Sequence, residues 1–203
     1  MRFRGVSAGP SMTHTTTRLA LVAAVAALLL AALLLAGCGR AEEQAFVPVH
    51  AAEPQHAELG WNESHPSPDG DRLVFQVAAL EVTTEGWSAA VSVINRTPYD
   101  FEIDTGPADY AFGLMLFKTD DLDEVKSANE QGQLPPVRKA TRIEPRPPHI
   151  LRPGVTWTTT LSAPGALPNG RWVRLVFGTF RGLGDAPPEF QRVVWFTDHT
   201  HML

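Results

Sequence analysis

The residues best suited to metal chemistry lie at the end of the sequence, which reads Asp198-His199-Thr200-His201-Met202. Two histidines separated by one residue place both imidazoles on the same face of an extended strand. Imidazole nitrogen suits zinc and copper, and the sulfur atoms of Met202 and Met115 suit Cu(I). A metal site needs three or four ligands, so the histidine pair predicts one only together with a sulfur ligand. We adopt the simpler interpretation, a pair of exposed histidines that binds no metal.

A second candidate for cation binding is the acidic run Thr119–Glu124, which reads Thr-Asp-Asp-Leu-Asp-Glu. Carboxylate oxygens are typical calcium ligands, but the run lacks the glycine and the ligand spacing of an EF-hand loop. The sequence therefore favours a solvated loop over a calcium site.

No motif of an activated nucleophile is visible in residues 38–203, which lack both Gly-x-Ser-x-Gly and a glycine-rich phosphate loop. The sequence therefore predicts no catalytic residue, no cofactor site and no enzyme. Two alternatives stay open. A Ser-His-Asp set can assemble from distant positions, because triads are recognised by geometry, and dispersed carboxylates can act on glycans.

The only cysteine, Cys38, follows a segment with the features of a secretory leader. Arg18 precedes eighteen consecutive Ala, Leu and Val residues, Leu19 to Ala36, and no acidic residue occurs before Cys38. A positive front, an apolar middle and small residues at the cleavage point define such leaders. The alternative is a signal anchor that remains as a membrane helix, since the run is close to spanning length. Either interpretation places the rest of the chain outside the cytoplasm.

The sequence Leu35-Ala36-Gly37-Cys38, at the end of that apolar run, resembles the lipobox of bacterial lipoproteins. The resemblance implies that residues 1–37 are a signal peptide and that Cys38 becomes the mature N-terminus. It also implies that the Cys38 thiol carries a diacylglyceryl group, with palmitate as a typical acyl chain. Because two acyl chains give a stable anchor, we expect a protein tethered to the extracytoplasmic face of the cell membrane.

The charge of the segment after the leader argues against nucleic acid as a partner. Three of the 17 basic residues and none of the 22 acidic residues precede Cys38, so residues 38–203 carry a net formal charge of −8. An acidic protein lacks the electrostatic attraction on which nucleic-acid binding depends. This segment also has no second cysteine, so its stability must come from a hydrophobic core and not from an internal disulfide.

Residues 38–70 predict a flexible tether between the lipid and a folded domain. The segment contains four prolines, six acidic residues and one basic residue, and such a composition buries too little apolar surface to become ordered. Trp61 is the exception, and we interpret it as an anchor for a partner or as a residue that docks on the domain.

Residues 71–203 predict a single β-sandwich domain of about eight short strands. The clearest strand is Val155–Ser162, in which Trp157, Thr159 and Leu161 share one face and threonines occupy the other. Prolines after residue 143 mark that region as a sheet edge or crossover. The further predicted strands are Leu73–Thr83, Trp87–Asn95, Asp100–Asp104, Tyr110–Lys118, Val137–Ile143, Trp172–Phe180 and Phe190–Thr197, the last two apolar on both faces and therefore central.

The order Leu151-Arg152-Pro153-Gly154, then Trp157 and threonines, then Asn169-Gly170 and Trp172–Phe177, resembles bacterial immunoglobulin-like domains that lack the cysteine pair. The resemblance implies an all-β, immunoglobulin-like two-sheet sandwich of the kind found in accessory and binding modules. We therefore expect a non-catalytic interaction module of the cell envelope that binds a protein, a polymer or a small ligand. The alternative is a lipoprotein that handles copper or zinc through His199, His201 and a methionine.

Overall fold

The structure is a computed structural model that describes residues 50–66, 70, 72–104 and 112–203. The predicted signal peptide, Cys38 and residues 38–49 of the predicted tether lie outside these ranges. The described elements are, in chain order, β1 (Gln55–Pro66), β2 (Arg72–Val82), β3 (Gly86–Arg96), β4 (Phe101–Asp104), β5 (Gly113–Phe117), α2 (Leu122–Glu130), β6 (Arg138–Lys139), β7 (Arg142–Glu144), β8 (Ile150–Leu151), β9 (Thr156–Pro164), β10 (Trp172–Gly182), α3 (Pro188–Gln191), β11 (Val193–Phe196) and β12 (His201–Met202).

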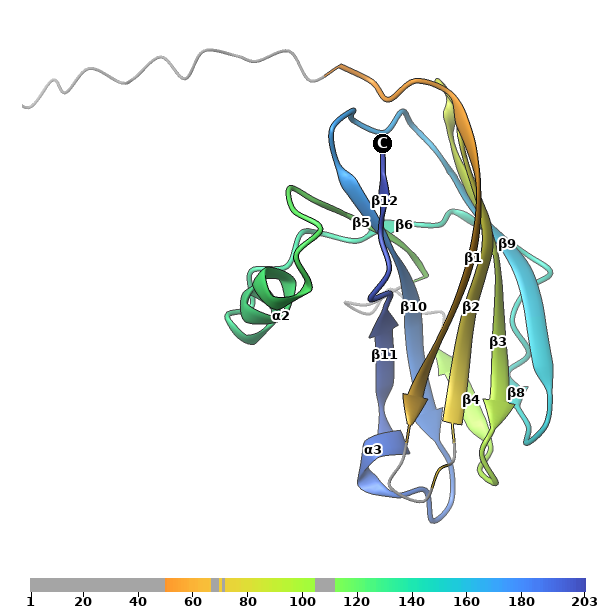
Figure 1. Cartoon of the computed structure of the whole chain (residues 1–203). Helices are drawn as coiled ribbons and strands as arrows, with labels where there is room; N and C mark the ends of the chain where they lie inside the picture. Colours follow the sequence, from red (N-terminus) through yellow and green to blue (C-terminus); the bar gives the residue numbers. More distant parts are fainter. Residues whose placement is uncertain (1–49, 67–69, 71, 105–111) are drawn as a thin grey trace, which may run out of the picture. The chain divides into compact units, whose positions relative to one another are not determined.

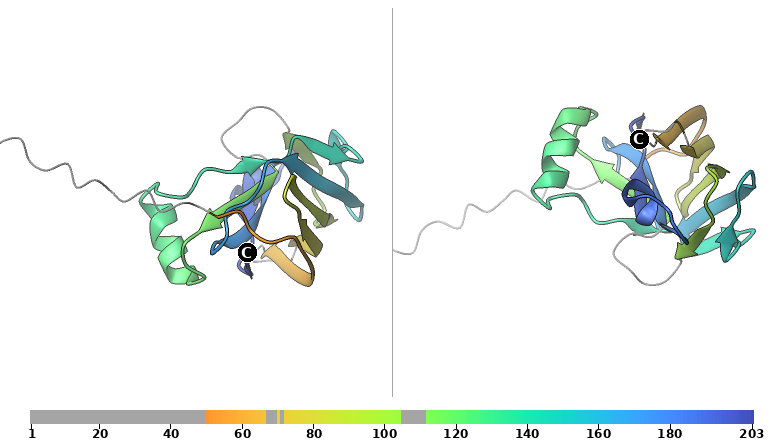
Figure 2. Two further views of the ribbon diagram at one scale, coloured as in Figure 1. Left: turned by 90° about the horizontal axis from the view of Figure 1, so that it is seen from above. Right: turned by 90° about the horizontal axis from the view of Figure 1, so that it is seen from below.

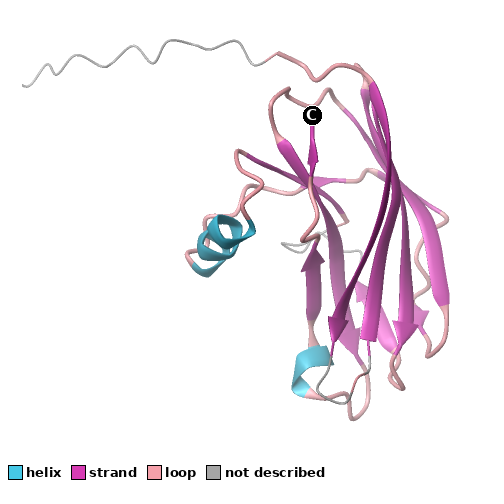
Figure 3. Cartoon of the chain, in the orientation of Figure 1, coloured by secondary structure: helices cyan, strands magenta, loops and turns pink. Residues whose placement is uncertain are grey.

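Two sheets make up the domain, as predicted (Figures 1 and 3). The first has the strand order β1-β2-β3-β9-β7, and the second has the order β6-β5-β10-β4-β8, with β11 and β12 also paired to β10. All strand pairs between these elements are antiparallel. Views along the strands show the two sheets facing each other, with α2 on the outer side of the second sheet (Figure 2).

Strict alternation of side chains explains how the first sheet covers the core. In β9, Trp157, Thr159 and Leu161 are buried and the residues between them are exposed, as the sequence predicted. Thr159 is tolerated in the core because its hydroxyl donates to the carbonyl oxygen of Pro145 at 2.8 Å, and a buried polar group with a partner costs little.

β10 is the central strand of the second sheet, which confirms its predicted place. Its apolar residues face two cores: Val173, Leu175 and Phe177 point into the sandwich, and Val176 packs in a second cluster with Met115, Phe117 and Val125 of α2. A strand covered on both faces is mostly apolar, and the buried Arg174 and Thr179 are the polar exceptions in β10.

Residues 55–66 form β1, so the prediction that the flexible tether extends to residue 70 is wrong. β1 pairs with β2 from Gln55↔Val82 to Pro66↔Arg72. The hydrogen bonds of this ladder provide partners for backbone N–H and C=O groups, an interaction that composition does not reveal. Trp61 is 8% exposed and belongs to the core. Order in the described chain extends further still, because Ala52 is buried and its N–H donates to the Leu167 oxygen at 2.7 Å.

Helix α2 was also not expected, and it accounts for the acidic run. Asp121 is the N-cap, with its carboxylate accepting from the N–H groups of Asp123 and Glu124 at 2.8 and 3.3 Å. Carboxylates at a helix N-terminus are stabilised by its free N–H groups and its dipole. Only Val125 of this helix is buried, so the sequence has no apolar stripe that would reveal it.

The segment after β5 crosses between the sheets, in agreement with its predicted edge position. The single strand expected at Val137–Ile143 is two short strands, β6 beside β5 and β7 beside β9. The strand expected at Phe190–Thr197 begins only at Val193, because Pro188–Gln191 forms α3. Its predicted central place is wrong, because among the described strands β11 pairs with β10 alone. Within the described ranges, no helix has the length and hydropathy needed to cross a membrane.

The predicted Asn169-Gly170 turn holds both ends of the described chain. Gly170 has a φ of 68°, a conformation that glycine adopts without steric cost. The Asn169 N–H donates to the His50 oxygen at 2.8 Å, and the Gly170 N–H donates to the Leu203 oxygen at 2.9 Å. The first and last described residues therefore meet at the same end of the domain.

We predict that Asn95→Ala lowers the free energy of unfolding by about 2–4 kcal/mol. Asn95 is fully buried. Its amide donates to the oxygens of Tyr99 and Leu151, and its carbonyl accepts from the backbone and the hydroxyl of Thr97. Urea unfolding measures the change. The exposed Asn129→Ala serves as control, and equal effects of the two substitutions would contradict the prediction.

Candidate functional site

The two histidines proposed as metal ligands both contact β1. His199 Nδ1 lies 2.7 Å from Glu63 Oε1, and His201 Nε2 lies 2.7 Å from Gln55 Oε1. His201 belongs to β12, whereas His199 lies in the bend before it. The pair therefore links the last segment of the second sheet to the first strand of the other sheet.

Glu63 of β1 is the acceptor for four N–H groups. Its side chain is 6% exposed. The carboxylate accepts from Trp195 Nε1 at 2.8 Å, from the backbone N–H groups of Asp198 and His199 at 2.9 Å each, and forms the bond to the His199 ring. Carboxylates that accept several N–H groups are held strongly, which compensates for burial of the charge.

Arg174 of β10 holds the carbonyl side of the same turn. It is fully buried. One terminal nitrogen donates to the oxygens of Thr197 and Asp198, and the other donates to the Asp120 oxygen at 2.8 Å. We name Glu63, Arg174 and the turn 197–199 between them the Glu63–Arg174 clamp. Its contacts are structural: the terminal nitrogens of Arg174 and the carboxylate of Glu63 bind the turn, Asp120 and Trp195.

Burial lowers the pKa of two basic side chains in this region, Arg174 and His201. Desolvation lowers the pKa of Arg174, and the negative charges of Asp198, Glu63 and Asp120 oppose that shift. Desolvation also lowers the pKa of His201. Because Gln55 Oε1 can only accept, the bond at 2.7 Å places the His201 proton on Nε2.

The structure does not gather the proposed metal ligands into one site. Met115 is buried in the second cluster beside α2, and Met202 is 45% exposed. His149 lies on β8's flank, 3.8 Å from Glu102. In the part of the chain that the structure describes, no group of three or more His, Cys, Asp or Glu residues is placed to hold a metal ion.

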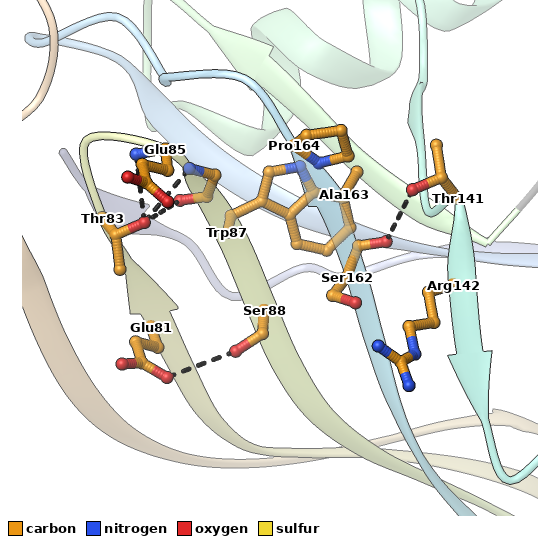
Figure 4. A pocket seen from close by; sticks show the side chains of 11 residues that line it. Glu81, Thr83, Glu85, Trp87, Ser88, Thr141, Arg142, Ser162, Ala163 and Pro164 are labelled. Carbon is orange, nitrogen blue, oxygen red and sulfur yellow. Dashed lines mark hydrogen bonds between the residues drawn. The ribbon is translucent and has the colours of Figure 1, made fainter.

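A hollow of about 360 Å³ opens on the outer face of the first sheet (Figure 4). Its lining comes from the turn between β2 and β3, the end of β9 and the start of β7. We name it the sheet hollow, and the lining residues that matter below are Glu81, Glu85, Trp87, Ser88, Arg142 and Ser162.

Four of these residues form a row across four strands. Glu81 pairs with Ser88, Ser88 with Ser162, and Ser162 with Arg142. Strands lie about 4.8 Å apart, so the row extends over about 14 Å. The Ser88 hydroxyl donates to Glu81 at 3.4 Å, and Arg142 pairs with Glu144 at 2.8 Å. The hydrogen bond and the charge of Glu144 raise the pKa of Arg142.

The sheet hollow could not be predicted from the sequence, because only Glu81 and Ser88, on the two strands of one hairpin, are close in the sequence, whereas Ser162 and Arg142 come from distant segments. Each lies at an outward position of its strand, which alternation alone predicts for Ser162. Their meeting depends on the register of β2, β3, β9 and β7, and that register is a property of the fold. A separate hollow of about 340 Å³ lies beside α2 and is lined by residues such as Leu116, Phe117 and Val125.

The chain matches no known family model, and no curated protein or solved structure is significantly similar to it.

We predict that Glu63→Gln lowers the free energy of unfolding by about 2–4 kcal/mol, because an amide cannot accept at both of its terminal atoms. The backbone N–H groups of Asp198 and His199 lose an acceptor, so their hydrogen exchange should accelerate more than that of the β2–β3 ladder. Glu130→Gln, on the exposed end of α2, is the matched control. Unchanged exchange at residues 198 and 199 would contradict this role of Glu63.

A further prediction concerns pH. Because the folded state lowers the pKa of His201, the folded protein binds fewer protons there than the unfolded chain. The contribution of His201 to the free energy of unfolding is therefore fully present above its pKa in the unfolded chain, about 6.5. That contribution is lost as the pH falls towards the lower pKa of His201 in the folded protein. His201→Gln should therefore lose less stability than the wild type between about pH 7.5 and pH 5.5. Parallel curves for the two proteins in urea unfolding would refute this, and Asn129→Ala provides a non-titrating control.

Proposed function

We propose that this chain is a bacterial lipoprotein, anchored by Cys38 to the extracytoplasmic face of the cell membrane. Its β-sandwich serves there as a non-catalytic binding module. The observation that carries the proposal is the position of the single cysteine, directly after the small residues that end an eighteen-residue apolar run. In the proposed modification, the Cys38 sulfur loses its proton and forms a C–S bond to the diacylglyceryl group of a membrane phospholipid. The C–O bond to the phosphate headgroup breaks, and the headgroup leaves with the bonding electrons and takes up the proton.

The domain supports a binding role through the surface that it exposes. The first sheet presents rows of small polar residues, such as Ser88, Ser92, Thr158 and Ser162, to solvent. The sheet hollow lies on this face and is built from paired strands, so its groups are held at fixed positions. The likeness of residues 151–177 to cysteine-free immunoglobulin-like domains agrees with an accessory module.

The net charge of −8 for residues 38–203 fits this environment. An anionic domain is repelled by the anionic lipid surface. It therefore favours partners that lie beside the membrane over direct adsorption of the domain to the lipid.

We predict that Cys38→Ala abolishes metabolic labelling with palmitate, because no other thiol exists to carry the lipid. Mass spectrometry of the wild-type protein should show loss of residues 1–37 and a diacylglyceryl thioether. Ala41→Ser, three residues beyond the thiol, is the matched control and keeps the label. An intact leader with a free Cys38 thiol in the membrane-extracted wild type would overturn the proposal.

A further inference from the structure

The sheet hollow offers acceptors at one end and donors at the other. Glu81 and Glu85 provide carboxylates beside the β2–β3 turn, and Arg142 provides a guanidinium on β7. Arg142 uses one N–H group for Glu144 at 2.8 Å, and a guanidinium has five N–H donors in all. The charge of Arg142 is thus balanced while most of its donors stay free for a ligand.

The middle of the row is shallow and polar because its side chains are small. Ser88 and Ser162 face each other across β3 and β9. The Ser88 hydroxyl already reaches towards Glu81 at 3.4 Å (Figure 4). Small side chains let a ligand approach the sheet closely, and hydroxyls both donate and accept.

One apolar residue of the lining lies on the same face of the sheet as the row. Pro164 pairs with Gly86 in the β3–β9 ladder, two residues beyond Ser162, and is exposed. Trp87 and Ala163 also line the hollow, but Trp87 is buried in the core between the sheets and Ala163 packs against that core. An exposed proline ring beside fixed donors and acceptors fits a molecule with one C–H face and a rim of hydroxyl groups.

The charges around the hollow select against strongly charged ligands. Among the residues that line the hollow, the carboxylates of Glu81 and Glu85 outnumber the guanidinium of Arg142, which is itself paired with Glu144, so an anion is repelled. A compact cation would gain from Glu81 and Glu85, but it would leave the donors of Arg142 and the Pro164 ring unused. An uncharged polyol uses the carboxylates as acceptors, the guanidinium as donor and the Pro164 ring for its C–H face.

We infer that the sheet hollow binds one or two units of a neutral saccharide belonging to an envelope polysaccharide. The inference rests on the proposed binding function and names its ligand class. A volume of about 360 Å³ is at the lower end of the range for small-molecule sites, about 300–1,000 Å³. The site is open to solvent on the sheet face, so a polymer can pass across it while one or two units occupy it.

The test uses the full chain purified in detergent and titrated calorimetrically with neutral tetrasaccharides of glucose, mannose, galactose and N-acetylglucosamine. At least one should bind saturably at millimolar concentration or below. Ser162→Leu fills the hollow and should weaken binding at least about tenfold. Thr160→Leu is the matched control, because it lies two residues away on the same face of β9 and does not line the hollow.

A second pair of variants distinguishes a loss of binding from a loss of folding. Glu81→Gln removes one exposed carboxylate and should also weaken binding about tenfold, since charge-assisted hydrogen bonds are the stronger ones. Glu130→Gln on α2 should leave the dissociation constant unchanged. Equal binding by the wild type, Ser162→Leu and Glu81→Gln would overturn the site.

Capture of envelope components separates this inference from the proposed function. If the full chain retains a component of a solubilised envelope but binds none of the tetrasaccharides, the ligand class is wrong and the binding module stands. If neither the tetrasaccharides nor any envelope component binds, both proposals fail. Retention of a strongly anionic or cationic polymer alone would also overturn the saccharide assignment.

Discussion

Opposite charges from the two sheets hold the same short turn. Glu63 of β1 accepts the N–H groups of Asp198 and His199, while Arg174 of β10 donates to the oxygens of Thr197 and Asp198. Burying either charge alone would cost several kcal/mol, so each is tolerated because the turn supplies its partners. The clamp joins β1 to the segment between β11 and β12, and with it the chain closes one edge of the sandwich without a disulfide.

The side chains around the Glu63–Arg174 clamp make structural contacts, whereas the outer face of the first sheet is open to solvent. The C-terminal histidines, which as a motif suggest metal chemistry, are engaged by Glu63 and Gln55. The acidic run caps α2 through Asp121. On the outer face of the first sheet, the paired strands hold the hydroxyls of Ser88 and Ser162, the Glu81 carboxylate and the Arg142 guanidinium in one row.

The sequence predicts the structure correctly where the pattern within one strand decides which residues are buried. The alternation in β9 and the apolar run in β10 predicted their exposure, because each strand's own residues meet either core or solvent. The prediction was wrong for β1. The four prolines and six acidic residues of segment 38–70 suggest disorder, but β1 is stabilised by its ladder with β2 and by burial of Trp61. The sheet hollow depends on register across four strands, which no single segment encodes.

The position of β1 has a mechanical consequence. Gln55 and His56, at the start of β1, pair with Val82 and Glu81, at the rim of the sheet hollow. If the N-terminal end is tethered and a polymer occupies the hollow, as proposed, tension would first load the hydrogen bonds of His50 and Ala52 to residues 167–169 and then the first rungs of the β1–β2 ladder. Glu63 pairs with Phe75, beyond these rungs, so the pull would reach the Glu63–Arg174 clamp only after they had opened.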